Sequence, residues 1–274
     1  MTARETFDTL FSARRDFFSS EASENLIYFT DDTGLRYAAK IFHADEKAPS
    51  IVFFPSCHFS LRDLETMAEE YTRAGINLLL LSYRADNSAE EALTLQQFLE
   101  DAEWLILQSL SWLEASGYTE GVFVMGQSLG AVAAIHVVEA NPQSFKGLFV
   151  ESVVLGTADF LDNFKKLPED CERSEDDALG CCQKIAGITL PTFIFHGARD
   201  RLLPVTDAEK LQASSGARSK QFFVVPGCEH KELYKNAGPL YFQTIKKSVD
   251  TVCGLNTWRQ QRKKFQRNKK KIEG

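Results

Sequence analysis

The chain has 274 residues, of which 44% are hydrophobic and 25% are charged, and its formal net charge is −7. A chain of this length can bury a large apolar core within one α/β domain. No apolar run reaches the ~18 residues that a membrane-spanning helix needs. Charges interrupt the apolar positions of the amino-terminal segment, which argues against a secretory signal. The sequence therefore favours a soluble globular protein of the cytoplasm.

Six cysteines are spread along the chain without the paired spacing of a zinc site or a redox dithiol. They are Cys57, Cys171, Cys181, Cys182, Cys228 and Cys253. We expect reduced thiols, no bound metal and no cofactor.

The predicted elements begin with a hairpin and continue as alternating strands and helices. Extended segments at 25–30 and 35–42 are joined by the turn 31–34. Buried strands are predicted at 50–55, 77–82, 121–126, 147–156, 191–197 and 221–227, and helices at 61–75, 93–116, 128–141, 207–213 and 233–253. Uninterrupted apolar strands separated by helices are typical of a parallel sheet covered on both faces. The predicted fold is α/β, a doubly wound and mostly parallel sheet with an antiparallel pair at its amino-terminal edge.

One α/β domain is predicted over 1–257, with a polar and acidic insert at 157–189 that we expect over the ends of the strands. The tail 258–274 holds eight basic residues and one acidic residue. Such a tail could contact nucleic acid or an anionic membrane, although a solvated terminus is the favoured interpretation. Nothing in the sequence indicates an oligomeric state.

The motif G-Q-S-L-G places Ser128 between Gly126 and Gly130, where a predicted strand meets a predicted helix. A serine hydroxyl needs a nearby base to act as a nucleophile, and the sharp turn of G-x-S-x-G exposes it to one. Two later stretches supply partners of the right type. Asp200 lies in H-G-A-R-D-R-L-L-P after one predicted strand, and His230 lies in P-G-C-E-H after the last.

This order of motifs resembles the α/β-hydrolase superfamily from about Leu26 to Val252, and within it a lid-poor branch of serine aminopeptidase-like, monoacylglycerol-lipase-like and acyl-thioesterase-like members. The resemblance implies that Ser128 attacks a carbonyl carbon. It implies that His230 takes the serine proton and that Asp200 orients the histidine.

The resemblance also implies an oxyanion hole, with the backbone N–H of Leu129 as one donor. The loop of the second donor departs from the family pattern, because Pro55 and Ser56 stand where the family has His-Gly. Alignment of the strand end makes the N–H of Cys57 the second donor, and His58 in the same loop is expected to contact substrate.

Several histidines and acids carry alternative interpretations. Glu151 or Asp159, after another strand, could replace Asp200 as the acid of the triad. His136 is expected to serve helix packing, and His196 to brace the turn that holds Asp200.

The sequence thus predicts a serine hydrolase that cleaves a carboxylic ester or thioester through an acyl-enzyme. The leaving group and acyl-chain length are not indicated by these motifs. The alternative hypothesis is a catalytically impaired protein of the same fold that acts as a binding or scaffold protein, because its oxyanion loop departs from the family pattern.

Overall fold

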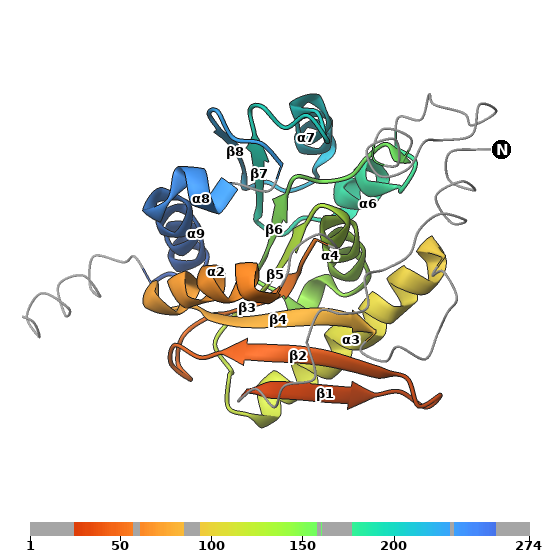
Figure 1. The fold of residues 1–274 in the computed structure, drawn as a ribbon, viewed down its shortest axis with the longest axis vertical. Helices are drawn as coiled ribbons and strands as arrows, with labels where there is room; N and C mark the ends of the chain where they lie inside the picture. Colours follow the sequence, from red (N-terminus) through yellow and green to blue (C-terminus); the bar gives the residue numbers. More distant parts are fainter. Residues whose placement is uncertain are drawn as a thin grey trace, which may run out of the picture.

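The computed structural model of the protein describes residues 25–56, 61–84, 94–157, 160, 177–230 and 233–255. Within those ranges, eight strands form one sheet in the order β1-β2-β4-β3-β5-β6-β7-β8 (Figure 1). The strands are β1 (Leu26–Thr30), β2 (Arg36–Phe42), β3 (Ser50–Phe54), β4 (Asn77–Arg84), β5 (Val122–Gln127), β6 (Gly147–Glu151), β7 (Thr192–Gly197) and β8 (Lys220–Val225).

The helices of the same ranges lie between these strands in the chain. They are α2 (Leu61–Arg73), α3 (Leu95–Ala115), α4 (Leu129–Ala140), the 3-10 turn η1 (Pro142–Ser144), α6 (Cys181–Gly187), α7 (Val205–Ser214), α8 (Leu233–Ala237) and α9 (Pro239–Val252). Strand β2 pairs antiparallel with both β1 and β4, whereas every pairing from β4 to β8 is parallel. The predicted fold class is confirmed.

Both faces of the sheet are buried, because successive side chains of a strand point to opposite faces. In β5, Val124 joins the core under α3, α4, α6 and α7, while Phe123 and Met125 join the core under α2, α8 and α9. Figure 1 shows these two helix layers on either side of the sheet. The double covering explains why the central strands read as continuous apolar runs rather than as alternating ones.

Two predicted elements differ from the structure. The predicted terminal helix 233–253 is two helices, because Gly238 adopts a φ of 54° and the ring of Pro239 begins α9. The predicted strand 147–156 ends at Glu151, since Ser152 turns the chain with a φ of 46°.

The insert predicted at 157–189 contributes to the core at its carboxyl end. There Cys181 and Ile185 of α6 are buried in the cluster that includes α4. The remainder of this insert at 158–159 and 161–176, and the tail 258–274, lie outside the described residues, and the domain boundary at 257 stays a prediction. Among the described helices, none is both long and apolar enough to cross a membrane.

Candidate functional site

Ser128 occupies the sharp turn between β5 and α4. Its φ of 55° lies in a region that residues with a side chain rarely adopt. The N–H of Ser128 donates to the carbonyl of Glu151, at the end of the neighbouring strand β6, over 2.9 Å. The turn therefore holds a strained serine at the carboxyl end of a central strand, where ligands bind in open α/β sheets.

The two glycines of the motif make this turn possible because they remove side-chain volume. A Cβ atom on Gly126 would lie 2.2 Å from the carbonyl oxygen of Gly130 and 2.6 Å from the Cα of Ala131. A Cβ on Gly130 would lie 2.2 Å from the carbonyl oxygen of Phe54, at the end of β3. Backbone atoms of the strand and of the helix occupy the space that these side chains would need.

His230 joins Ser128 to Asp200 by two hydrogen bonds. Its Nδ1 lies 2.8 Å from Oδ2 of Asp200, and its Nε2 lies 3.2 Å from Oγ of Ser128. All three residues are largely buried, with 0% of Ser128 and 7% of His230 exposed. The arrangement matches a nucleophile, a base and an acid that orients the base.

The loops that carry Asp200 and His230 are held against each other by backbone contacts. The N–H of Arg199 donates to the carbonyl of Cys228 over 2.8 Å. A Cβ on Gly197 would lie 2.6 Å from that carbonyl oxygen, so a glycine at the end of β7 permits the approach. The side chain of Cys228 is buried in the core under α2, α8 and α9.

Asp200 is fixed at both carboxylate oxygens. Its Oδ1 accepts the backbone N–H groups of Leu202 and Leu203 at 3.0 and 2.9 Å, and its Oδ2 faces His230. Burial alone would raise the pKa of Asp200, but the hydrogen bond and charge of His230 and the N–H of Leu203 outweigh it and lower this pKa. Asp200 is therefore stabilised as a carboxylate.

His196 braces the turn after β7, as predicted. It is fully buried, and its Nε2 donates to the carbonyl of Leu203 over 2.9 Å. Burial lowers the pKa of His196 and favours the neutral ring.

Glu151, one of the two alternative acids of the triad, has other hydrogen-bond partners. The carboxyl group of Glu151 is hydrogen-bonded to the side chains of Gln127 and Tyr241, and His230 directs its Nδ1 to Asp200 instead. Asp159 lies outside the described residues. The geometry of the described residues favours Asp200 as the partner of His230.

Of the two predicted oxyanion donors, Leu129 belongs to the described residues and Cys57 does not. Leu129 begins α4, and the first N–H groups of a helix have no partner within it. Its N–H and the dipole of α4 can stabilise a negative charge beside Ser128. The end of β3 packs against the same helix turn, since a Cβ on Gly130 would lie 2.7 Å from the carbonyl oxygen of Pro55. Cys57 and His58 lie outside the described residues.

His136 lies within α4, the helix that follows Ser128. It contacts Lys184 of α6 and Glu103 of α3 over 2.7 and 2.8 Å, so it joins three helices. Its predicted role in helix packing agrees with these contacts.

Two residues near the turn were missed by the sequence analysis: Gln127 and Tyr241. Gln127 is the variable residue before the serine in G-x-S-x-G, and Tyr241 lies over 110 positions later on α9 with no motif around it. For Gln127, the available sequence signal was its own polar side chain at the end of a buried strand. No local signal identifies Tyr241.

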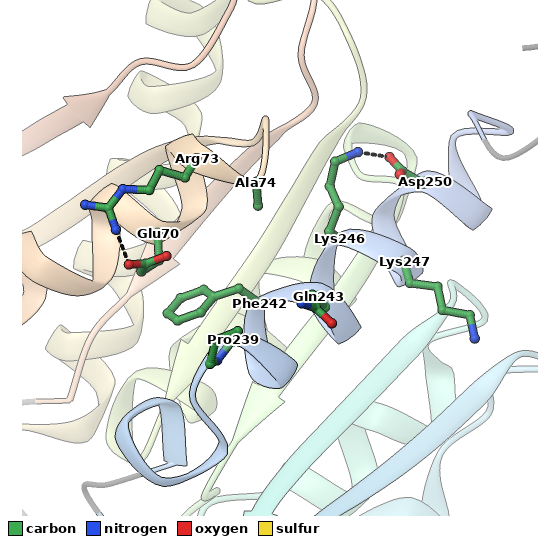
Figure 2. Close-up of a pocket in the computed structure, with 9 residues that line it drawn as sticks. All are labelled: Glu70, Arg73, Ala74, Pro239, Phe242, Gln243, Lys246, Lys247 and Asp250. Carbon is green, nitrogen blue, oxygen red and sulfur yellow. Dashed lines mark hydrogen bonds and ion pairs between the residues drawn. The ribbon is translucent and has the colours of Figure 1, made fainter. Parts of the chain in front are cut away.

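A separate cavity of about 400 Å³ lies between α2 and α9 (Figure 2). No member of the Ser128–His230–Asp200 group lines it. Among the charged side chains that line it, Arg73 pairs with Glu70 and Lys246 with Asp250, and the dashed lines of Figure 2 mark these pairs. Within the described ranges, no three His, Cys, Asp or Glu side chains are arranged to hold a metal ion.

Solved structures resemble the whole described fold, whereas no protein-family model matches the chain. A soluble variant of monoglyceride lipase from Saccharomyces cerevisiae, in complex with a substrate analog, aligns with a TM-score of 0.62 at 13% identity, over 88% of this chain and 98% of the lipase. An esterase from Pyrococcus furiosus gives 0.64 at 16% identity, over 83% and 92%. Mouse alpha/beta hydrolase domain-containing protein 10 gives 0.59 at 16% identity, over 83% and 99%. These similarities show that the chain has an α/β-hydrolase fold.

Proposed function

We propose that this chain, which has the α/β-hydrolase fold, is a serine hydrolase that cleaves carboxylic esters or thioesters. The observation that carries the proposal is the continuous chain of hydrogen bonds from Oγ of Ser128 through His230 to Asp200. These groups come from three separate loops at the carboxyl ends of the parallel strands of one sheet, and packing alone does not require that they meet.

In the proposed reaction, Oγ of Ser128 attacks the carbonyl carbon of the substrate while Nε2 of His230 accepts the hydroxyl proton. The carbonyl electrons move to oxygen, and the N–H of Leu129 stabilises the resulting oxyanion. Asp200 stabilises the imidazolium through Nδ1. His230 then protonates the leaving alcohol or thiol as its bond to carbon breaks, which leaves an acyl-enzyme. Water, activated by the same histidine, releases the acid and regenerates Ser128.

Two considerations support an ester or thioester as the substrate. The names of the yeast monoglyceride lipase and the Pyrococcus esterase denote ester cleavage in those proteins. Alkoxide and thiolate are also better leaving groups than an amide nitrogen, so they demand less of an oxyanion hole. This matters here because Pro55 and Ser56 replace the His-Gly that the superfamily resemblance leads us to expect.

The test is hydrolysis of p-nitrophenyl esters from acetyl to palmitoyl, and of an acyl thioester, by the wild-type protein and by Ser128→Ala. The matched control is Ser109→Ala, because Ser109 is also buried but bonds the carbonyl of Leu105 within α3. We expect turnover and fluorophosphonate labelling of the wild type and of Ser109→Ala, and neither for Ser128→Ala. No turnover and no label on wild-type Ser128 would overturn the proposal and favour the scaffold hypothesis.

A further inference from the structure

Glu151 places a carboxyl group inside the protein, directly behind the turn that carries Ser128. Only 2% of this residue is exposed. Its Oε1 accepts a hydrogen bond from the side-chain amide of Gln127, and its Oε2 accepts one from the hydroxyl of Tyr241. Burying a carboxyl group is costly unless it gains such partners. The cost indicates that this group does something that an apolar residue would not.

The backbone of Glu151 acts on the same turn. Its carbonyl accepts the N–H of Ser128 over 2.9 Å, while its side chain bonds Gln127, the preceding residue. Glu151 therefore holds both Gln127 and Ser128, through which β5 enters the strained turn. Because the φ of 55° at Ser128 is unfavourable, the surrounding structure must hold it in place.

Alternation along the strands explains why these groups meet. Leu148 and Val150 of β6 point into the core under α4, whereas Phe149 points to the core under α2 and α9. Glu151 is two positions beyond Phe149, so it shares that second face. There α9 supplies Tyr241, whose hydroxyl donates to Glu151, and α2 supplies Tyr71, whose hydroxyl donates to Sδ of Met125.

Electrostatics agree with a tightly enclosed group. Burial raises the pKa of Glu151, although its bonds to Tyr241 and Gln127 and the charge of His230 oppose that rise. The charge of Asp200 adds to it. Burial also raises the pKa of Tyr241, followed by the effect of Glu151.

We propose that Glu151 is a positioning residue that fixes the Gln127–Ser128 segment so that Oγ of Ser128 stays aligned with His230. The inference rests on the proposed hydrolase function. Glu151 does not exchange a proton with the substrate in this role, and its acceptor oxygens are what matter. Displacing a reacting group by about 1 Å can cost on the order of 100-fold in rate.

The variants separate hydrogen bonding from charge and from folding. Glu151→Gln removes the charge but can keep both bonds, because the Gln127 amide can rotate to present its Oε1, which has no partner among the described residues. Glu151→Leu has a similar volume and no acceptor. Tyr241→Phe removes one bond to Glu151 and provides a second test if Glu151→Leu does not fold. Tyr37→Phe is the matched control, because Tyr37 is also a buried tyrosine but its hydroxyl donates to Asp101 of α3 at 2.8 Å, in the core on the opposite face of the sheet.

The experiment measures kcat and KM on p-nitrophenyl acetate, the rate of fluorophosphonate labelling, and the melting temperature of each variant. We expect Glu151→Leu to lower kcat and the labelling rate about 10- to 100-fold with KM changed less than about threefold. Tyr241→Phe should have a smaller effect in the same direction. Glu151→Gln and Tyr37→Phe should keep kcat within about threefold of the wild type.

Two results would overturn the inference while leaving the proposed function intact. One is a folded Glu151→Leu, or a folded Tyr241→Phe, with the kcat and labelling rate of the wild type. The other is a loss in Glu151→Gln as large as in Glu151→Leu, which would assign the effect to charge rather than to the bonds. A wild type that is itself inactive and unlabelled, like Ser128→Ala, would instead overturn the proposed function.

Discussion

Nε2 of His230 lies 3.2 Å from Oγ of Ser128, although 102 positions separate the two residues in the sequence. The register of the parallel strands accounts for this proximity. Strand β5 ends at Gln127, before Ser128, and pairs there with Glu151 of β6, while Gly197 of β7 pairs with Val225 of β8. The loops that follow these strand ends therefore share one edge of the sheet. A change that shifts any of these strand ends should alter the site before it alters the fold.

Substitution of Gly130 by alanine tests the packing of the turn. The added Cβ would meet the carbonyl oxygen of Phe54 at 2.2 Å, and backbone atoms cannot move away cheaply. We expect Gly130→Ala to lower the free energy of unfolding by about 1–3 kcal/mol and to lower kcat/KM by on the order of 100-fold or more. Urea unfolding and ester hydrolysis measure the two effects.

The control for that change is Gly187→Ala, at the end of α6. Its nearest neighbour would be Cγ of Glu139 at 4.0 Å, so the methyl group fits. Stability should stay within about 1 kcal/mol of the wild type, because alanine is the better helix residue, and activity should be unchanged. Wild-type activity in Gly130→Ala would contradict the close approach of β3 to the turn.

Replacement of Asp200 by asparagine tests the orientation of His230. Oδ1 can still accept the N–H groups of Leu202 and Leu203, so the loop should keep its shape. The new amide would present N–H to Nδ1 of His230, which favours the tautomer whose Nε2 carries the proton and cannot accept one from Ser128. We expect kcat to fall on the order of 10³- to 10⁴-fold with the melting temperature nearly kept.

The matched control for this replacement is Asp101→Asn, since Asp101 of α3 bonds the hydroxyl of Tyr37 of β2 and is not part of the Ser128–His230–Asp200 group. It should retain full activity. A kcat that survives in Asp200→Asn but falls in Glu151→Gln would make Glu151 the acid of the triad instead.

The arrangement of strands and helices was predictable because its signals are local. Runs such as 51–55 and 78–81 are apolar throughout, and Gly126 and Gly130 flank Ser128 where side-chain volume would collide with the backbone. The meeting of Ser128, Asp200 and His230 was predictable because each lies in a short motif after a strand, and the sheet brings such positions to one edge.

The partners of Glu151 were not predictable, because they depend on tertiary packing. The sequence placed Glu151 after a strand and allowed it a role as the acid of the triad. The face of the sheet on which the Glu151 side chain lies depends on where β6 ends. Its contact with Tyr241 depends on where α9 crosses that face. The break before α9 was also missed, because the apolar periodicity continues on both sides of Gly238.

His136 gives the protein a titratable link between three helices. Lys184 of α6 donates to its Nδ1, which requires an unprotonated nitrogen there, and Nε2 faces Glu103 of α3. Burial lowers the pKa of His136 below its ordinary value of 6.5, and the charge of Lys184 lowers it further, while Glu103 and Glu139 oppose the shift. The folded protein therefore resists a proton that the unfolded chain accepts.

This linkage predicts the sign of a pH effect on stability. Below the ordinary pKa of 6.5, the unfolded state binds more protons at His136 than the folded state does. The contribution of neutral His136 to stability is therefore complete above that pH, and it is lost as the pH falls toward the lowered pKa. The difference in melting temperature, His136→Gln minus wild type, should therefore rise as the pH falls from about 7 to about 5. The loss of stability with falling pH should be smaller in Lys184→Met than in the wild type, but it should persist because His136 remains buried. A difference that stays constant over this range would show that His136 titrates alike in both states.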